Sequence, residues 1–560
     1  MAVTKKELAM LMQTYKQLRA MREPYLVLWK KVSRWIDPWY GNMDMDSNPG
    51  VNPLPAKTDL YDSTVGWYSQ VFSTGLQGYT CSSQSAFFEL TTERQDGSED
   101  EEQGIAKILQ ARTRKMYKVL ASSGFYSAIH NFFKSFGDLG TGIMMFGVNA
   151  DNKIYYEYVP NYTCIIMEDK TINRVDTLFR TIWMTKYETK KSFNLKDDEL
   201  PEAMKEDRND PTKKYKFIQL ICPRDRFELS LSNEYRYVEL VWLEESPEKT
   251  IFEGGSDYLR FAVCPFAKGF DGTGWGIGAP GLRQFSSSHT LQNMSRDQMN
   301  ASQLLSAPPM KKTDNVHAEI RPGGFITIPP GGDIAPLQLG ADLSWTNAMR
   351  LDLRNLAKAD YFVDYFLMLS QYSGNVNTAT LAQGLQNEQL KMMTFFLDNL
   401  KETFFEPVID WTWNTMGKLG LFNEEGVDIS YDKLQVDYIS PLYRLQKQAV
   451  SLEPTINAMN IILPYIQIDP TLINYIDFSG YVQAVSEGTG ADARVIRNKA
   501  EAEKLIMAQA EAERQKSEAE QRIKQQEADT RSYEATQKAP EQGSLAQEEE
   551  NSKYKDLFLR

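Results

Sequence analysis

The sequence has few of the residues that usually carry catalysis or bind metals. Its four cysteines form no C-x-x-C pair, so we expect reduced thiols rather than a disulfide framework. The cysteines are Cys81, Cys164, Cys222 and Cys264, and the three widely separated histidines are His130, His289 and His317. No H-E-x-x-H, G-x-S-x-G or P-loop pattern is present. These absences indicate a protein that is not an enzyme and that holds no metal and no cofactor.

Long hydrophobic runs are also missing. The amino terminus from Met1 to Glu7 is charged and lacks the apolar core of a secretory signal. The longest apolar runs, such as residues 143–146, are far shorter than the roughly 20 residues that span a bilayer. We therefore expect a protein that is made and kept in a cytoplasm.

Basic residues are fewer than acidic ones. The chain has 62 Lys and Arg residues and 75 Asp and Glu residues, which gives a net charge of −13. A protein that coats nucleic acid needs clustered cations, so that class is excluded. A protein that lets DNA pass without holding it is not excluded. The length of 560 residues is enough for about three or four domains. With 42 % hydrophobic residues, most of the chain is expected to be globular.

The amino-terminal part has helical periodicity. Apolar residues recur at helical spacing over residues 5–37, and we predict two helices separated near Pro24. Further predictions are helices over 59–76 and over 105–138 with a hinge at Ser122-Ser-Gly124, and loops over 41–57 and 94–104.

Between residues 143 and 269 the hydrophobic period changes to two, which is typical of strands. The short runs of β type are residues 154–159, 177–183, 217–222, 237–242 and 259–263. They predict a mostly antiparallel sheet. The fold class is therefore α+β, and mainly helical.

Long helices return in the carboxyl-terminal half. Two of them, 282–305 and 342–372, flank an insert rich in Pro and Gly over 306–341. After a break at 372–378, a third long helix is predicted over 378–419, with a bend at Pro407. Residues 491–538 form an Ala-rich helical segment without proline or glycine. Because one such helix buries little surface alone, we expect it to pack against copies of itself.

One segment, Gly276-Ile-Gly-Ala-Pro-Gly281, matches the G-x-G-x-x-G pattern of dinucleotide-binding loops. Pro280 removes a backbone N–H that a phosphate site would use, and no repeating βαβ pattern surrounds the segment. We interpret it as a flexible loop that leads into a helix.

Several short segments stand in a characteristic order and spacing across residues 15–460. They are Trp29-Lys-Lys-Val-Ser-Arg-Trp-Ile-Asp-Pro38, Asp59-Leu-Tyr-Asp-Ser-Thr64, Ser73-Thr-Gly-Leu76, Phe136-Gly-Asp-Leu-Gly-Thr-Gly142, Trp275-Gly-Ile-Gly-Ala-Pro-Gly281, Arg321-Pro-Gly-Gly324 and Asn377-Thr-Ala-Thr380. In these segments the chain resembles the portal, or head-to-tail connector, proteins of short-tailed T7-like bacteriophages. No single segment is specific, but their order is.

The resemblance implies a portal fold and a ring, usually of twelve subunits, at one vertex of the capsid. Double-stranded DNA is packaged and ejected through the channel of such a ring. The implied parts are a wing (1–279), a first stem helix (280–305), a clip (306–341), a second stem helix (342–372), a tunnel loop with a long helix and wing return (373–440), a crown (441–489), a barrel helix (490–538) and a disordered tail (539–560).

Candidate functional residues follow from this layout. The DNA channel would be lined by Gln371, Tyr372, Ser373, Gly374, Asn375, Asn377, Arg350 and Arg354. Contacts of the clip with terminase and adaptor would come from Lys311, Lys312, Arg321, Phe325, Ile326 and Ile328, and barrel packing from Ala502, Leu505, Ala512 and Ile523. An acidic channel wall repels phosphates, while a few cations centre the duplex. For the cations Lys311, Lys312, Arg350 and Arg354, a salt bridge between subunits is the open alternative.

The same resemblance names the partners. Because the chain has no P-loop, ATP hydrolysis must come from a partner, which would be the large terminase subunit docked at the clip. The tail adaptor would later take the same place, internal core or ejection proteins would meet the crown and barrel, and scaffold and major capsid protein would surround the ring. The expected location is the virion, at a capsid vertex, after assembly in the host cytoplasm. The apolar residues of the clip favour strand pairing between neighbouring clips.

Two other functions stay open. The Lys-Ala-Glu-Ala-Glu repeats of 499–525 also suit a coiled-coil structural scaffold without a DNA channel. An enzyme of the capsid or tail would instead bind a nucleotide at Gly276–Gly281.

Overall fold

A computed structural model describes most of the first 443 residues and short pieces beyond them. The described residues are 3–46, 60–92, 99–149, 151–196, 200–206, 212–231, 234–247, 249–269, 271–306, 310–312, 334–336, 343–371, 392–422, 434–443, 458–459, 461–462, 464–465, 507–508, 511–512, 514–526 and 530–531. The chain divides into two units, Met1–Ala449 and Val450–Arg560. The first unit mixes helices with antiparallel strands, which confirms the α+β prediction at that level.

The first helix, α1 (Lys5–Trp35), is continuous, so the predicted break at Pro24 is wrong. Thr4 caps the helix with its hydroxyl, which accepts from the backbone N–H of Glu7, and the Glu7 carboxylate accepts from the Thr4 N–H in return. Apolar residues on both sides of the proline, such as Leu11 and Trp29, are fully buried. Their packing outweighs the roughly 3 kcal/mol that an interior proline costs a helix.

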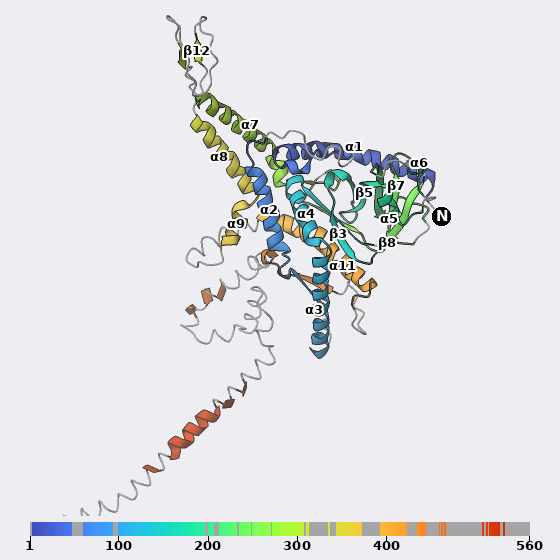
Figure 1. Cartoon of the computed structure of the whole chain (residues 1–560). Helices are drawn as coiled ribbons and strands as arrows, with labels where there is room; N and C mark the ends of the chain where they lie inside the picture. The colour runs from blue at the N-terminus through green and yellow to red at the C-terminus, as the bar shows by residue number, and fades with distance from the viewer. Residues whose placement is uncertain are drawn as a thin grey trace, which may run out of the picture. The chain divides into compact units, whose positions relative to one another are not determined.

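The buried face of α1 covers a five-stranded antiparallel sheet of order β4-β5-β6-β7-β8 (Figure 1). Its strands are β4 (Cys164–Asp169), β5 (Arg174–Thr185), β6 (Lys214–Pro223), β7 (Tyr237–Leu243) and β8 (Thr250–Ser256). Ile218 of β6 faces α1. Its neighbour Phe217 lies in a second cluster, with Met204 of α6 (Glu202–Glu206) and with Phe193 of α5 (Lys186–Phe193). Successive side chains of a strand alternate between faces, so the two helical layers bury both sides of the sheet.

A second, three-stranded sheet of order β3-β2-β9 packs against α4 (Phe125–Leu139). Its strands are β2 (Thr141–Val148), β3 (Ile154–Tyr158) and β9 (Phe261–Pro265). The hinge expected at 122–124 is confirmed, because Gly124 adopts φ +79° between α3 (Glu99–Ser122) and α4. Since α3 begins at Glu99, the predicted loop over 94–104 is wrong in its second half. Helix α2 (Thr64–Thr80) packs along α4.

The described part of the predicted third long helix runs over 392–400 and then through a π-helical turn, η6 (Lys401–Phe405), into α11 (Glu406–Lys418). Pro407 stands in the first turn of α11, where its missing N–H costs little, so the irregularity falls before the proline rather than at it. Phe404 of η6 stacks on Phe132 of α4 with 4.1 Å between ring centroids. Nearby, β1 (Phe88–Thr92) pairs with β14 (Leu434–Tyr438).

The Gly276–Gly281 segment is a packing element and not the flexible loop that we predicted. It contains β11 (Gly276–Ile277), which pairs with β10 (Ala267–Lys268), and it leads into the next helix. A Cβ atom on Gly276 would overlap the Gly140 carbonyl oxygen, and one on Gly281 would overlap the Asp138 carbonyl oxygen. Gly276 and Gly281 therefore let two backbone segments touch, whereas the space beside the middle glycine, Gly278, is open.

The described pieces of the second unit between residues 507 and 531 are helical, and their side chains are exposed. All four cysteines of the chain are buried and form no disulfide. Within the described ranges, no helix combines the length and the hydropathy that crossing a membrane requires. Nor do three or more His, Cys, Asp or Glu side chains of those ranges gather as they would around a metal ion.

The glycine contact predicts a large loss of stability for Gly281→Ala. The added methyl group meets backbone atoms of Asp138 that cannot move aside, so we expect a loss of about 3 kcal/mol or more in the free energy of unfolding, measured by urea denaturation. The matched control is Gly78→Ala in α2, where nothing lies within 4 Å of the new Cβ. Alanine is the better helix former, so this variant should be neutral or up to about 1 kcal/mol more stable. Equal losses in both variants would contradict the steric argument.

Candidate functional site

The region predicted to be the stem contains a pair of antiparallel helices, α7 (Pro280–Ser306) and α8 (Leu343–Asp360), that lie side by side and are called the stem helices below (Figure 1). Between them in the chain, β12 (Met310–Lys312) pairs with β13 (Ile334–Pro336). The helix predicted over 342–372 is in fact two helices, because Phe362 adopts φ +52° between α8 and α9 (Val363–Gln371). A bulky residue is uncommon in this left-handed region, so the surrounding structure must fix it there.

Polar contacts join α7 to α8 along their length. Near the start of α7, the Arg283 guanidinium lies 3.2 Å from a carboxylate oxygen of Asp360, and the Gln284 amide donates to the other oxygen. Toward the other end, Gln298 of α7 bonds to Asn347 and Arg350 of α8. The two helices are thus held together at both ends by side chains within one chain.

Asp62, in the loop before α2, anchors the middle of this helix pair. Arg354 of α8 donates to its carboxylate through Nε at 3.1 Å and a terminal nitrogen at 2.6 Å, and Arg350 lies 3.5 Å away. Gln292 of α7 accepts from the backbone N–H groups of Tyr61 and Asp62, at 2.7 and 2.9 Å. The loop is therefore fixed by both stem helices at once.

Burial alone would raise the pKa of Asp62, whose side chain is 1 % exposed. Hydrogen bonds from Thr64 and the Arg354 guanidinium outweigh this effect and lower the pKa below its ordinary value. Asp62 is therefore ionised at neutral pH, and its charge neutralises that of the Arg354 guanidinium.

A second buried carboxylate, Asp138 at the end of α4, joins the stem to the rest of the unit. Tyr361, at the break after α8, donates to Oδ1 at 2.8 Å. Ser69 of α2 and Tyr40 of the short helix η1 (Pro38–Tyr40) donate to Oδ2 at 2.7 and 3.1 Å. Three hydroxyl groups from three separate segments thus converge on one fully buried carboxyl group.

Burial raises the pKa of Asp138 to about 6, although the Ser69 and Tyr361 hydrogen bonds oppose the shift. Burial and the Asp138 charge also raise the pKa values of Tyr40 and Tyr361 well above 10. Both phenols therefore keep their protons and act as donors. Asp37 and Lys134, which form an ion pair with each other, lie close enough to act on Asp138 as well.

The structure brings two predicted channel residues, Arg350 and Arg354, together at Asp62. Gln371 is the last residue of α9, whereas Tyr372, Ser373, Gly374, Asn375 and Asn377 lie outside the described residues. Of the clip residues, Lys311 and Lys312 are in β12, and Arg321, Phe325, Ile326 and Ile328 lie outside. Of the barrel residues, Ala512 and Ile523 are exposed on helical pieces, and Ala502 and Leu505 lie outside. The roles predicted for all these residues stay predictions.

Sequence reasoning missed the two anchoring carboxylates as site residues. Both stand within segments that carry the family resemblance, Asp59–Thr64 and Phe136–Gly142. The signal was therefore present, but an aspartate in a short segment does not reveal which distant hydroxyl or guanidinium groups surround it.

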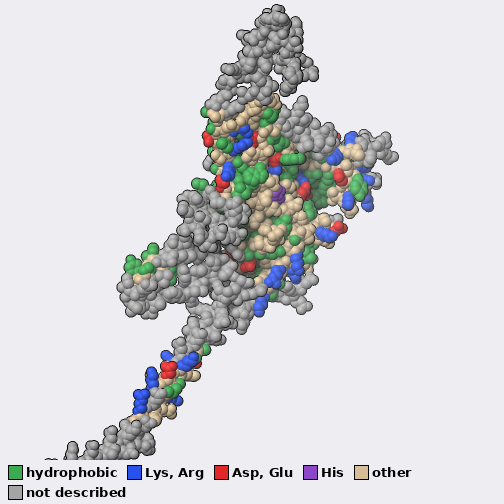
Figure 2. Space-filling model, turned by 60° about the vertical axis from the view of Figure 1, so that its left-hand side comes forward, with side chains coloured by type: hydrophobic (Ala, Val, Ile, Leu, Met, Phe, Trp, Pro, Cys, Tyr) green, Lys and Arg blue, Asp and Glu red, His purple; other side chains and the backbone are tan. Residues whose placement is uncertain are grey.

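Apolar side chains remain exposed on α8. Trp345, Met349, Leu351 and Leu356 are 67, 38, 55 and 51 % exposed. Figure 2 shows hydrophobic side chains among charged ones on the stem-helix face. At 100° per residue, Trp345, Met349 and Leu356 share one side of the helix, and Leu351 projects from the other side. Large apolar side chains that stay exposed in this way are typical of surfaces that contact another protein.

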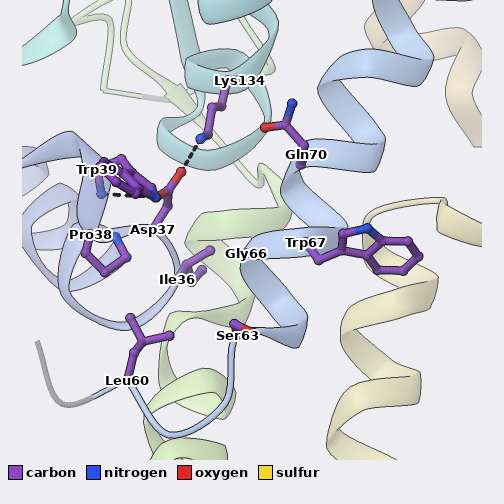
Figure 3. A pocket seen from close by; sticks show the side chains of 10 residues that line it. All are labelled: Ile36, Asp37, Pro38, Trp39, Leu60, Ser63, Gly66, Trp67, Gln70 and Lys134. Carbon is purple, nitrogen blue, oxygen red and sulfur yellow. Dashed lines mark hydrogen bonds and ion pairs between the residues drawn. The ribbon is translucent and has the colours of Figure 1, made fainter.

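An open pocket of 530 Å³ lies between the end of α1 and the start of α2 (Figure 3). Lys134 pairs with Asp37 in it, and Trp39 and Trp67 at its edge are 81 and 51 % exposed. Because the two charged groups neutralise each other, the pocket offers mainly apolar surface.

The structure thus has a mixed α+β body and a helix pair, α7 and α8, with the paired strands β12 and β13 between the two helices in the chain. The family model described as "Bacteriophage head to tail connecting protein" matches residues 8–496, and the chain belongs to this family. It is similar to a probable portal protein of Bordetella phage BPP-1, with 24 % identity over 500 residues that cover 88 % of this chain and 89 % of the relative. It is also similar to a portal protein of Salmonella phage epsilon15, with 24 % identity over 518 residues and 89 % of both chains. The resemblance read from the sequence is confirmed.

The Asp62 cluster predicts that Arg354→Ala is destabilising. The change leaves the buried Asp62 carboxylate without its main partner. We expect the free energy of unfolding to fall by about 2 kcal/mol, which lies between the losses typical of breaking an exposed ion pair and a fully buried one. The control is Arg296→Ala, whose exposed partner Asp297 is adjacent on α7; it should cost less than about 0.5 kcal/mol. In urea denaturation, the double variant Asp62→Asn with Arg354→Ala should lose less than the two single variants combined. Additive losses would mean that the two side chains do not interact.

The Asp138 network predicts a pH dependence of stability. This carboxyl group has a pKa of about 6 in the folded chain and about 3.9 in the unfolded chain, so the folded state binds its proton more tightly. The resulting stabilisation of the fold is fully present below pH 4. That contribution is lost as the pH rises through 6 and amounts to about 3 kcal/mol. Relative to Asp138→Asn, the wild-type chain should therefore become less stable between pH 4 and pH 7 in thermal denaturation. Tyr361→Phe keeps the carboxyl group but removes a hydrogen bond that lowers its pKa, so the fall in stability should remain and should extend to higher pH. A constant difference between wild type and Asp138→Asn would contradict this reasoning.

Proposed function

We propose that this chain is a portal subunit, copies of which close into a ring at one capsid vertex. Double-stranded DNA passes through the channel of that ring during packaging and ejection. The membership in the head-to-tail connecting family supports the role, and both relatives are named as portal proteins. The observation that carries the proposal further is the apolar surface on two sides of α8.

A closed ring of identical subunits needs two different contact surfaces on each subunit, one for each neighbour. The α7–α8 pair offers them, because its internal polar contacts are made within one chain and its apolar side chains point outward on separate sides. Trp345 and Leu356 would contact one neighbour and Leu351 the other. Burying such side chains contributes roughly 1.5–3 kcal/mol each, repeated at every interface.

In this proposal the protein has no enzymatic activity of its own, and the large terminase subunit hydrolyses ATP while docked at the clip. The tail adaptor later binds there, and internal core proteins meet the crown and barrel. Because Asp62 neutralises Arg354, the uncharged polar residues from Gln371 to Asn377 are the preferred channel lining. Uncharged contacts let a duplex slide without a deep binding minimum, whereas free cations bind phosphate.

Electron microscopy of the purified protein tests the ring. We expect closed rings around a channel wide enough for a duplex, and no rings from Trp345→Asp or Leu351→Asp, because each buries a charge at every interface. The matched control is Tyr187→Asp on α5, where an aromatic side chain is 70 % exposed away from the stem. It should form rings like the wild type.

The outcomes separate the alternatives. If both stem variants formed rings, α8 would not lie in the interface between subunits, but the proposal of a portal would stand. A wild-type protein that stays monomeric, even with capsid and scaffold proteins added, would argue against a portal and favour the coiled-coil scaffold.

A further inference from the structure

A hollow of 570 Å³ lies between α1 and α7, away from the stem contacts. We call it the basic groove and define it by Lys30, Lys31, Arg34, Trp35, Phe285 and His289. Lys30, Lys31 and Arg34 are exposed on the last turns of α1. The groove thus gathers three cations in a chain whose net charge is −13.

Aromatic rings hold the cations of the groove. The Lys31 ammonium group lies 5.3 Å from the centre of the Phe285 ring, and the Arg34 guanidinium lies 4.8 Å from that of Trp35. The Trp35 ring in turn contacts the His289 ring at 4.3 Å. None of the three cations forms an ion pair with a carboxylate in the described part of the chain, unlike Lys134, which pairs with Asp37. Among the described residues, their charge is therefore not neutralised by a carboxylate and is available to a ligand.

The groove continues into an exposed stripe of α1. At 100° per residue, Ala20, Pro24, Val27, Lys31 and Arg34 lie on one side of the helix. The first three are apolar and exposed, with Val27 at 47 %, and Met21 beside them is 59 % exposed. The surface therefore has an apolar half and a cationic half along one helix.

We propose that this surface docks another protein through a segment that carries both carboxylates and apolar side chains. The carboxylates would lie in the basic groove, and the apolar side chains would cover the stripe around Val27. Charge complementarity selects an anionic ligand, and the adjoining apolar half selects protein over nucleic acid. A phosphate backbone would use the cations but leave Met21 and Val27 exposed. The three cations also span little more than one helical turn, which is short for a path along DNA.

Fluorescence anisotropy with the full-length protein tests the proposal. The probe is a labelled helical peptide of about 18 residues, with Leu on one face and Glu on the other. A second peptide with Lys in place of Glu, and a labelled DNA duplex, are run in parallel. We expect binding of the Glu peptide that weakens with added salt, and little binding of the Lys peptide or the duplex.

The variant K30E/K31E/R34E should weaken binding of the Glu peptide about 30-fold or more, because three attractive contacts become repulsive. The charge-matched control is K107E/R114E/K118E on the exposed side of α3, which should change binding less than about twofold, since it alters net charge equally at another place. Val27→Ser should weaken binding about threefold to tenfold through lost apolar burial.

Four outcomes would overturn the proposal. These are no binding of the Glu peptide, equal effects of the two charge-reversal variants, preferred binding of the duplex, or peptide binding to unassembled subunits that disappears in rings. The third would identify a nucleic-acid site, and the fourth would identify a neighbouring copy of the chain as the occupant. The docking proposal can be tested independently of the portal function. If the K30E/K31E/R34E variant loses peptide binding but still forms rings like those of the wild type, the groove acts in docking and not in ring assembly.

Discussion

The buried Asp138 carboxyl group links the stem helices to the body of the first unit. It accepts hydrogen bonds from the end of η1, from α2 and from the break after α8, so three segments far apart in the sequence share one acceptor. A carboxylate without water is costly, and it persists because hydroxyl groups replace the water on both oxygens. That arrangement raises the carboxyl pKa to about 6, so the junction between stem and body is more stable in mild acid and becomes weaker as the pH rises through 6.

The two buried carboxylates, Asp62 and Asp138, position different parts of the stem helices. Asp62 fixes the middle of the α7–α8 pair through Arg354 and Gln292, and Asp138 fixes its lower end through Tyr361. Because the polar groups of the stem satisfy one another inside the subunit, the surface left for neighbours is apolar on α8. The basic groove of α1 and α7 shows the opposite arrangement. Its cations lie against aromatic rings but form no ion pair with a carboxylate in the described residues, so their charge stays available at the surface.

Periodicity predicted most of the elements that bury one clear face. The hinge at Gly124 and the central strands β5, β6 and β7 follow from such patterns. The edge strand β8 was missed because all its residues are half-buried and it contains two glycines, so it has no alternation to detect. The continuous α1 and the broken stem helix were both misjudged for one reason. Tertiary packing decides whether Pro24 or Phe362 interrupts a helix, and local propensity does not contain that information. For the site, the order of short segments identified the family, but the partners of Asp62 and Asp138 could be known only from the fold.

The contact of Gly276 and Gly281 with the backbone after α4 bears on how glycine-rich patterns are interpreted. In a phosphate-binding loop, glycine clears space that a ligand then fills. Here the space beside the first and third glycines is already occupied by the carbonyl groups of Gly140 and Asp138, and only Gly278 has open space beside it. A search that scores only the spacing of glycines cannot distinguish these cases. The quantity that does is the free volume above the glycines, which an inserted methyl group measures directly.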